Sequence, residues 1–249
     1  MQPDTKSIIK VRDLTKRFGD FIAVDSISFD VYRGEIFGFI GANGAGKTTA
    51  MKMITGLLAP TSGVIEVAGC DVAGQPDLVK TRIGYMSQRF SLYEDLRVGE
   101  NIRFYGGIYG LSDAEILSRT ETLLRELDMG QMSGYLVKDL PLGWKQKLAF
   151  STALLHRPEV IFLDEPTGGV DPVTRRQFWE MIYREAERGT TIFVTTHYMD
   201  EAEYCDRVSI MVDGVIRALD TPGALKKQFK ATSMDEVFVK LARNMEAST

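Results

Sequence analysis

The stretch Gly41-Ala42-Asn43-Gly44-Ala45-Gly46-Lys47-Thr48-Thr49 decides the fold of this chain. It fits the pattern G-x-x-x-x-G-K-[ST], in which glycines allow backbone N–H groups to surround phosphate oxygens. The apolar run at residues 36–40 predicts a buried strand before the loop, and residues 47–58 predict a helix after it. A strand, a loop and a helix in this order are the context that the pattern requires.

The residue types in this loop suit a nucleoside triphosphate. The helix that begins near Gly46 directs its positive end toward the same anion. Lys47 can reach the β- and γ-phosphates, and the Thr48 hydroxyl can bind Mg²⁺. We therefore expect ATP and Mg²⁺ as ligands, with the nucleotide bound by the loop residues Gly41, Asn43, Gly44, Ala45, Gly46, Lys47, Thr48 and Thr49.

Composition places the chain among ordinary globular proteins. Its 249 residues are 44% hydrophobic and 26% charged, which allows one large domain or two small ones. The net charge of -4 argues against a nucleic-acid-binding surface, and two cysteines are too few for a disulfide framework. Neither a signal peptide nor a run of 18 apolar residues is found in the sequence, so we expect a cytoplasmic location and membrane contact only through a partner.

Two further apolar strands end in polar side chains. Residues 160–163 are followed by Asp164 and Glu165, and residues 191–195 are followed by His197. Because the carboxyl ends of parallel strands meet at one edge of a sheet, these side chains should lie beside the phosphate-binding loop. Asp164 is predicted to hold Mg²⁺ and Glu165 to orient and deprotonate the attacking water, while His197 can donate to a γ-phosphate oxygen.

The rest of the chain predicts an α/β fold with two additions. Short strands are expected at residues 8–14, 21–24, 27–31, 64–67 and 83–86, with a hairpin about Asp213-Gly214. Residues 89–157 show helical spacing without strand signals, including a capping box from Ser112 to Glu115 and a helix opened by Pro141. We predict a parallel or mixed sheet flanked by helices, an antiparallel β lobe, and an inserted helical subdomain within a domain spanning 1–220. A short helical tail is expected at 221–249.

Three aromatic features leave alternatives open. Phe18, beside Gly19, is either a core side chain or a ring that stacks on the nucleotide base. The patch Phe104, Tyr105 and Tyr109 is interpreted as helix core in preference to a docking surface. His156 is interpreted as a C-terminal helix cap without a further function.

Taken together, the motifs resemble the nucleotide-binding subunit of an ABC transporter over residues 7–220. Residues 41–49 match Walker A, Gln88 the Q-loop, residues 160–165 Walker B, residues 168–171 the D-loop and His197 the switch histidine. Phe18 falls where the family has its base-stacking aromatic residue. The resemblance implies a head-to-tail dimer in which Gln88 contacts Mg²⁺ or the attacking water.

One motif departs from the family pattern. The family signature L-S-G-G-x-x-Q appears as Leu140-Pro141-Leu142-Gly143-Trp144-Lys145-Gln146. Leu142, Gly143 and Gln146, together with Asp171 of the D-loop, would contact the ATP held by the partner. The serine hydroxyl that contacts the γ-phosphate is lost, and Leu142 adds bulk where the backbone should approach it. This form is similar to signatures in bacterial multidrug-type exporters.

The resemblance implies an ATP-binding and ATP-hydrolysing subunit that powers export through a separate membrane permease. Its second ATPase domain would be its own copy or a homologue, and it would sit on the inner face of the cell membrane. The alternative is a soluble ABC ATPase that acts on nucleic acid or ribosomes. Repair ATPases carry long coiled coils between the Walker motifs and translation factors carry two cassettes, whereas this chain shows one cassette without sustained heptads. A GTPase would need an N-K-x-D element, which the sequence lacks.

Overall fold

A six-stranded sheet forms the centre of the protein. The computed structural model describes residues 4–88 and 92–246. The sheet has the order β10-β9-β3-β8-β7-β6, with parallel pairing throughout except for β10, which lies antiparallel to β9. Its strands are β3 (Ile36–Ile40), β6 (Ile83–Met86), β7 (Val160–Asp164), β8 (Thr191–Thr196), β9 (Arg207–Val212) and β10 (Val215–Asp220).

Every residue of β3, β7 and β8 is buried, which explains why their sequences are almost continuously apolar. The strands predicted from these runs are confirmed. The predicted hairpin about Asp213 and Gly214 is confirmed as well. Both residues have positive φ angles, 49° and 78°, as a tight two-residue turn of this type requires.

The second sheet is antiparallel and has the order β2-β1-β4-β5. Its strands are β1 (Asp4–Phe18), β2 (Phe21–Arg33), β4 (Ser62–Val67) and β5 (Cys70–Asp71). The prediction of two strands at 21–24 and 27–31 is wrong, because both belong to β2. The pairing with β1 shifts register there, Ser26 has a φ of 45°, and its N–H donates to the Thr15 hydroxyl at 3.0 Å. A β-bulge therefore lets β2 continue across Asp25 and Ser26, the polar pair that lies between the two predicted strands.

Aromatic packing joins the two sheets. The ring of Phe29 on β2 stacks on Phe37 of β3 at 5.5 Å between centroids and lies 5.6 Å from Phe39. Phe193 on β8 packs against all three rings. This cluster holds the antiparallel lobe against the strand that leads into the phosphate-binding loop.

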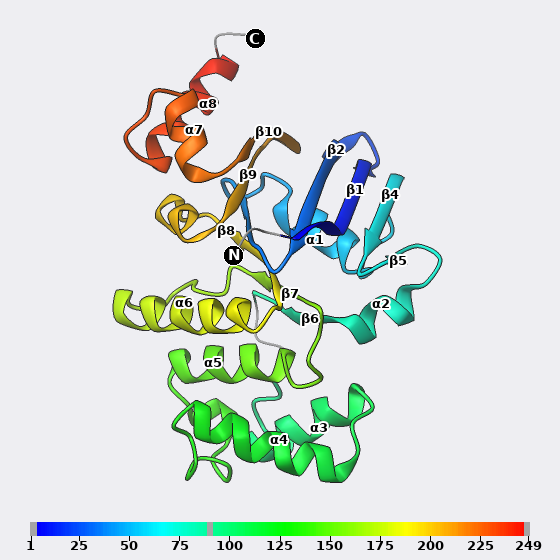
Figure 1. Cartoon of the computed structure of the whole chain (residues 1–249), viewed down its shortest axis with the longest axis vertical. Helices are drawn as coiled ribbons and strands as arrows, with labels where there is room; N and C mark the ends of the chain where they lie inside the picture. The colour runs from blue at the N-terminus through cyan, green and yellow to red at the C-terminus, as the bar shows by residue number, and fades with distance from the viewer. Residues whose placement is uncertain (1–3, 89–91, 247–249) are drawn as a thin grey trace.

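Helices form both ends of the molecule. In Figure 1, α3, α4 and α5 lie at the bottom, whereas α7 and α8 lie at the top. The helices are α1 (Lys47–Ile54), α2 (Pro76–Arg82), α3 (Val98–Ile108), α4 (Asp113–Glu126), α5 (Leu142–Ala153), α6 (Pro172–Glu187), α7 (Pro222–Gln228) and α8 (Met234–Glu246), with 3-10 turns η1 (Val137–Asp139) and η2 (Met199–Tyr204). We find no helix long and apolar enough to cross a membrane within the described ranges.

The helix boundaries confirm some predictions and correct others. The capping box of Ser112 and Glu115 at the start of α4 is confirmed. Helix α1 ends four residues before the predicted position, because Gly56 takes a φ of 74° and reverses the chain. Pro141 is the N-cap of α5 and not its first helical residue, since its carbonyl accepts the N–H groups of the third and fourth following residues. The short helix α2 and the strand β5 were not among the predicted elements.

The C-terminal helices pack on the central sheet. Leu225, Met234 and Val237 are buried in the same apolar cluster as Val208 and Ile210 of β9. The tail therefore shares the core of the preceding residues. The domain boundaries expected near residue 220 and at 89–157 stay predictions.

His156 connects the helical region to the central sheet. Its Nε2 donates to the Ile83 carbonyl of β6 at 2.9 Å, and its ring stacks on Tyr109 with 3.7 Å between centroids. The interpretation of His156 as a helix cap is therefore wrong, since α5 already ends at Ala153. Burial lowers the pKa of His156, and the Ile83 hydrogen bond opposes that shift only in part.

We expect His156 to make stability depend on pH. Its Nδ1 is buried without a hydrogen-bond partner among the described residues, so a proton there would place an unpaired N–H and a charge in the interior. The folded pKa lies below the ordinary 6.5, and the unfolded chain therefore binds the proton first as pH falls. The melting temperature of the wild type should fall relative to His156→Gln between pH 7.5 and pH 5.5. Thermal melts of both proteins that run parallel with pH would contradict this prediction.

Candidate active site

Three parallel strands deliver the predicted site residues to one edge of the sheet. Ile40, the last residue of β3 before the loop, pairs with Thr196 of β8. Asp164, the last residue of β7, pairs with Thr195 of β8. Glu165 and His197 directly follow these strand ends, as the sequence predicts.

The phosphate-binding loop is held close to neighbouring backbone. Gly46 is the N-cap of α1 with a φ of 100°, and a Cβ there would lie 2.4 Å from the Ala23 carbonyl oxygen. A Cβ on Gly41 would lie 2.3 Å from the Met211 carbonyl oxygen. Only glycine fits at both positions, so the loop backbone and the first N–H groups of α1 are fixed in place.

Lys47 lies inside the loop that it belongs to. Its side chain is 4% exposed, and its Nζ donates to the carbonyl oxygens of Gly41 at 2.7 Å and Ala42 at 3.0 Å. The same Nζ is 3.6 Å from Glu165 Oε1. Burial lowers the pKa of Lys47, and the Glu165 carboxylate opposes this shift. The structure thus brings the predicted lysine and the predicted base together.

Asp164 and Thr48 form the predicted metal-binding pair. Asp164 Oδ1 accepts hydrogen bonds from the hydroxyls of Thr195 at 2.7 Å and Thr48 at 3.2 Å. Burial raises the pKa of Asp164, while both hydroxyl donors favour its ionised form. A hydroxyl and a carboxylate are hard oxygen ligands, which Mg²⁺ combines with phosphates and water, so these residues fit the ion. No cluster of three His, Cys, Asp or Glu side chains suited to a metal occurs in the described part of the chain.

Glu165 is the meeting point of the other predicted catalytic residues. Its Oε2 accepts from Gln88 Nε2 and from His197 Nδ1, each at 3.0 Å. Glu165 has a φ of 47°, a conformation that a side-chain-bearing residue seldom adopts and that recurs at functional sites. Gln88, predicted both as a metal ligand and as a catalytic group, contacts Glu165 here. The structure therefore assembles a carboxylate with a lysine, an amide and an imidazole.

A cavity of about 340 Å³ opens beside this carboxylate. It is lined by Gln88, Gln146, Glu165 and His197 among others. Gln146, predicted to bind nucleotide, is 1% exposed and donates from Nε2 to the Gly168 carbonyl at 3.2 Å. In a single chain Gln146 thus anchors the loop that follows Glu165.

Leu142, Gly143 and Asp171 line a different cavity, of about 350 Å³, to which no phosphate-loop residue contributes. Leu142 is 41% exposed. Asp171 caps α6 by accepting the N–H groups of Val173 and Thr174. One chain therefore does not bring these predicted nucleotide contacts to its own phosphate-binding loop.

Two aromatic alternatives are resolved by exposure. Phe18 is 51% exposed at the tip of the β1–β2 hairpin, which rules out a core role. Phe104 is 40% exposed, so the interpretation of its patch as helix core is wrong for this residue. Helix α3 buries Ile102 on its other face, and the ring of Tyr93 packs edge-on against Phe104 with 4.8 Å between centroids.

Sequence reasoning also missed Thr195. Its hydroxyl donates to Asp164 and accepts the N–H of Glu165 at 3.1 Å, so it orients both acids. The available signal was the pair Thr195 and Thr196 at the end of an apolar run just before His197, because a hydroxyl buried in a sheet needs a hydrogen-bond partner.

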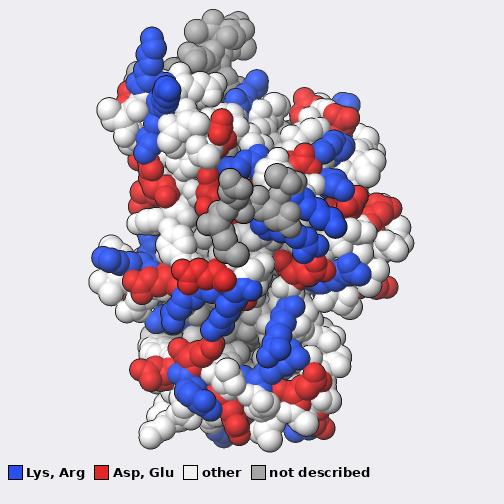
Figure 2. Space-filling model, viewed as in Figure 1, with Lys and Arg blue, Asp and Glu red and all other residues white. Residues whose placement is uncertain are grey.

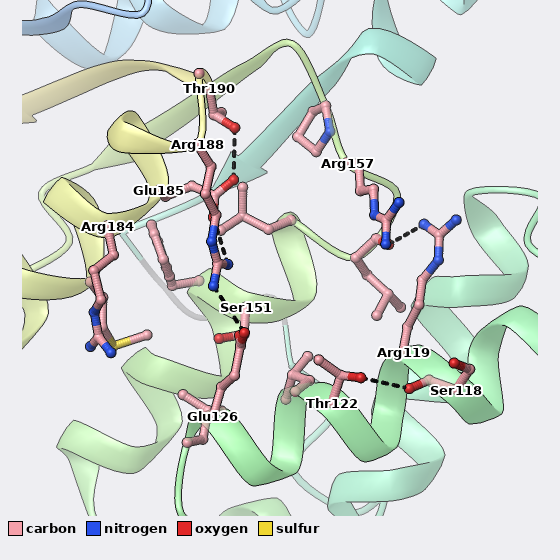
Figure 3. A pocket seen from close by; sticks show the side chains of 18 residues that line it. Ser118, Arg119, Thr122, Glu126, Ser151, Arg157, Arg184, Glu185, Arg188 and Thr190 are labelled. Carbon is pink, nitrogen blue, oxygen red and sulfur yellow. Dashed lines mark hydrogen bonds and ion pairs between the residues drawn. The ribbon is translucent and has the colours of Figure 1, made fainter.

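A larger cleft, of about 720 Å³, lies between α4, α5 and α6. Figure 3 shows Arg188 reaching between Glu185 and Glu126, to which it lies within 3.3 Å and 2.9 Å. None of the predicted catalytic residues lines this cleft. The ion pair of Arg188 with Glu126 joins the end of α6 to α4 across this cleft. The cleft is separate from the site around the Glu165 carboxylate.

Comparison with known proteins identifies the family. The model of the ABC transporter domain family matches residues 24–168, which is more than half of the chain. The chain belongs to the ABC transporter family of ATP-hydrolysing domains. This confirms the resemblance and the α/β phosphate-loop fold, and it makes the chain an ATP-binding domain of this family.

Relatives among known proteins agree with this assignment. The chain is 44% identical over 246 residues to the probable multidrug ABC transporter ATP-binding protein YbhF of Escherichia coli, covering 97% of this chain and 43% of that protein. It is 38% identical to the Nod factor export ATP-binding protein I of Burkholderia lata, covering 87% of this chain and 72% of that protein. The chain thus spans less than half the length of the Escherichia coli relative.

A solved structure of an ATP-binding subunit of an ABC transporter superimposes with a TM-score of 0.86 at 32% identity. The superposition covers 95% of this chain and all of the other chain. The likeness therefore extends beyond the family domain to the C-terminal helices.

Proposed function

We propose that this chain is the ATP-hydrolysing subunit of an exporter, which closes on a second ATPase domain around ATP and drives a separate membrane permease. The observation that carries the proposal is the Glu165 carboxylate, held by Gln88 and His197 within 3.6 Å of Lys47. The names of the relatives support export, since they include multidrug and Nod factor exporters.

The phosphate-binding loop accounts for nucleotide binding. The glycine-shaped backbone and the start of α1 present N–H groups to the β- and γ-phosphates, and Lys47 adds a positive charge. Thr48 and Asp164 would hold Mg²⁺, which neutralises charge on the phosphates. The half-exposed ring of Phe18, which Lys16 Nζ approaches to 5.1 Å from its centroid, would stack on the adenine base.

Glu165 is proposed as the general base. An ionised carboxylate with an amide and an imidazole as donors can orient one water molecule and accept its proton. His197 would donate a hydrogen bond to a γ-phosphate oxygen, which supports the negative charge that develops in the transition state. Gln88 would position the same water or the metal ion.

A second ATPase domain completes the site in this proposal. Leu142, Gly143 and Asp171 lie on a cavity apart from the phosphate-binding loop. Their roles as nucleotide contacts therefore require a facing subunit. The start of α5 would present its positive end to that subunit's ATP.

The exposed apolar patch of Tyr93, Phe104 and Ile108, called the aromatic patch after its two rings, is proposed as the surface for the permease. Their exposed fractions are 49%, 40% and 60%, and Tyr93 follows closely on the Gln88 segment. A permease segment bound there would therefore act close to a residue that touches Glu165. The chain would thereby sit on the inner membrane face.

Charge does not favour the alternative function on nucleic acid or ribosomes. Figure 2 shows basic and acidic side chains intermixed over the visible face instead of gathered into a basic surface. Together with the net charge of -4, this gives little electrostatic attraction for a polyanion.

Replacing Glu165 by glutamine should block hydrolysis and spare binding. We expect ATP turnover to fall at least about 100-fold, as for the loss of a general base, while the Kd for ATP changes little. Light scattering should then detect a dimer of Glu165→Gln that forms only with MgATP. Glu187→Gln, an exposed change at the last residue of α6, is the matched control and should keep wild-type turnover.

Wild-type turnover in Glu165→Gln would contradict the proposal that Glu165 is the general base. A monomer that binds MgATP but never dimerises would contradict closure on an identical copy, and it would favour a different second ATPase domain.

Restoring the standard signature should speed closure on an identical copy. Pro141→Ser with Leu142→Gly adds a hydroxyl and removes a side chain that is 41% exposed. A hydrogen bond to a charged phosphate oxygen supports a rise in kcat of up to about tenfold. The check is the ATPase rate at saturating ATP, with Pro141→Ala and Leu142→Ala as the control. An unchanged or lower rate in the restored variant would be evidence against a homodimer.

A charge in the aromatic patch should weaken membrane binding. Phe104→Asp is expected to lower binding to inner-membrane vesicles of the source cells by about tenfold, as for loss of an aromatic interface anchor. Turnover in the isolated chain should stay unchanged. Leu117→Asp, which alters a more exposed apolar residue on α4, is the control for general effects of charge. Equal vesicle binding by the two variants would remove the patch from the permease interface.

A further inference from the structure

Glu201 is a fully buried acid outside the assembled carboxylate site. It lies in η2, four residues after His197, and has an exposed fraction of 0%. Its Oε1 accepts the Thr167 hydroxyl at 2.6 Å and lies 3.6 Å from Arg175 Nε. Its Oε2 has no hydrogen-bond partner among the described residues. Burial of a carboxylate costs free energy that only its hydrogen bonds and ion pairs can offset.

The contacts of Glu201 join three segments that carry the site. Thr167 is two residues after Glu165, in the loop that leads to α6. Arg175 lies in the first turns of α6, and its guanidinium stacks on the ring of Tyr198 at 4.1 Å. Tyr198 is the neighbour of His197, and their two rings lie 4.2 Å apart. Glu201 is thus the group that these segments share.

The loop between Glu165 and α6 is fastened from two sides. On one side Gln146 of α5 donates to the Gly168 carbonyl, and the Gly168 N–H donates to the Glu165 carbonyl. On the other side Glu201 holds Thr167, which is 1% exposed. A shift of this loop would therefore disturb the hydrogen bond from Gln146 or the one to Glu201. The same loop carries Glu165 at its start.

We propose that Glu201 is a positioning residue, which keeps the Glu165 loop and the His197 segment in register so that His197 Nδ1 meets Glu165 Oε2. Glu201 touches neither group directly. It acts through the Thr167 hydroxyl on one side and through Arg175 and Tyr198 on the other. The inference rests on the proposed catalytic role of Glu165, and it adds a residue that the sequence motifs did not single out.

Steady-state kinetics of the full chain test this role. Glu201→Gln and Thr167→Val should each lower kcat about 10- to 100-fold, because a small displacement of a catalytic group has effects of that size. The KM for ATP should stay within about twofold, since the phosphate-binding loop is untouched. Thr167→Ser keeps the hydroxyl and should restore most of the lost kcat.

The chain offers a matched control on the same turn. Glu203 is two residues away, is partly exposed and binds Lys226 at 2.7 Å. Glu203→Gln removes the same charge and should leave kcat unchanged. The double variant Glu201→Gln with Thr167→Val should lose little more kcat than either single variant, because both substitutions disrupt the same hydrogen bond between Thr167 and Glu201.

Each outcome decides the proposal. A kcat within twofold of wild type in Thr167→Val overturns it, even where Glu201→Gln fails to fold. A rise in KM at constant kcat, or an equal loss in Glu203→Gln or Thr167→Ser, also overturns it. Glu165→Gln is measured beside these variants: if its turnover is abolished while Glu201→Gln is normal, only the positioning role fails. If Glu165→Gln stays active, the proposed function itself fails.

Discussion

The pair of hydrogen bonds that Asp164 Oδ1 accepts from the Thr48 and Thr195 hydroxyls is the interaction on which the rest of the site depends. It ties the start of α1 to the ends of β7 and β8, so the phosphate-binding loop and both acids share one frame. Asp164 is 2% exposed, and its burial is tolerated because two hydroxyls donate hydrogen bonds that water would otherwise supply. The N–H of Glu165 donates to the same Thr195 hydroxyl, which passes this order on to the carboxylate.

Strand topology explains why much of the site could be predicted from the sequence. Parallel strands buried on both faces leave continuous apolar runs, so β3, β7 and β8 could be recognised without any tertiary information. Their carboxyl ends meet at one edge, which brings Lys47, Glu165 and His197 together although 150 residues separate the first from the last. Local chemistry was enough for the Ser112 capping box, because it depends on neighbours within one turn.

What could not be predicted depends on contacts between distant segments. The bulge at Ser26 needs Thr15 across the sheet, and the role of His156 needs the Ile83 carbonyl and the ring of Tyr109. No pattern within residues 199–204 shows that Glu201 is buried while Glu203 is exposed, because that difference arises only when α6 and the Glu165 loop pack against η2. Phe104 and Ile102 lie on different faces of α3, and only Ile102 is buried. The helical spacing of the sequence did not distinguish the two faces.

Within one chain the predicted site residues fall into two groups. Glu165 is surrounded by donors from its own chain, whereas Leu142 and Gly143 face outward beside Asp171. Gln146 stands between these two regions, since it is buried beside the base cavity and holds the loop that runs on to Asp171. In the proposed dimer, a facing subunit that closes on this surface would act on the Glu165 loop through Gln146, which holds Gly168. Because Glu201 holds Thr167 on the opposite side of that loop, we expect the geometry of Glu165 to respond to closure.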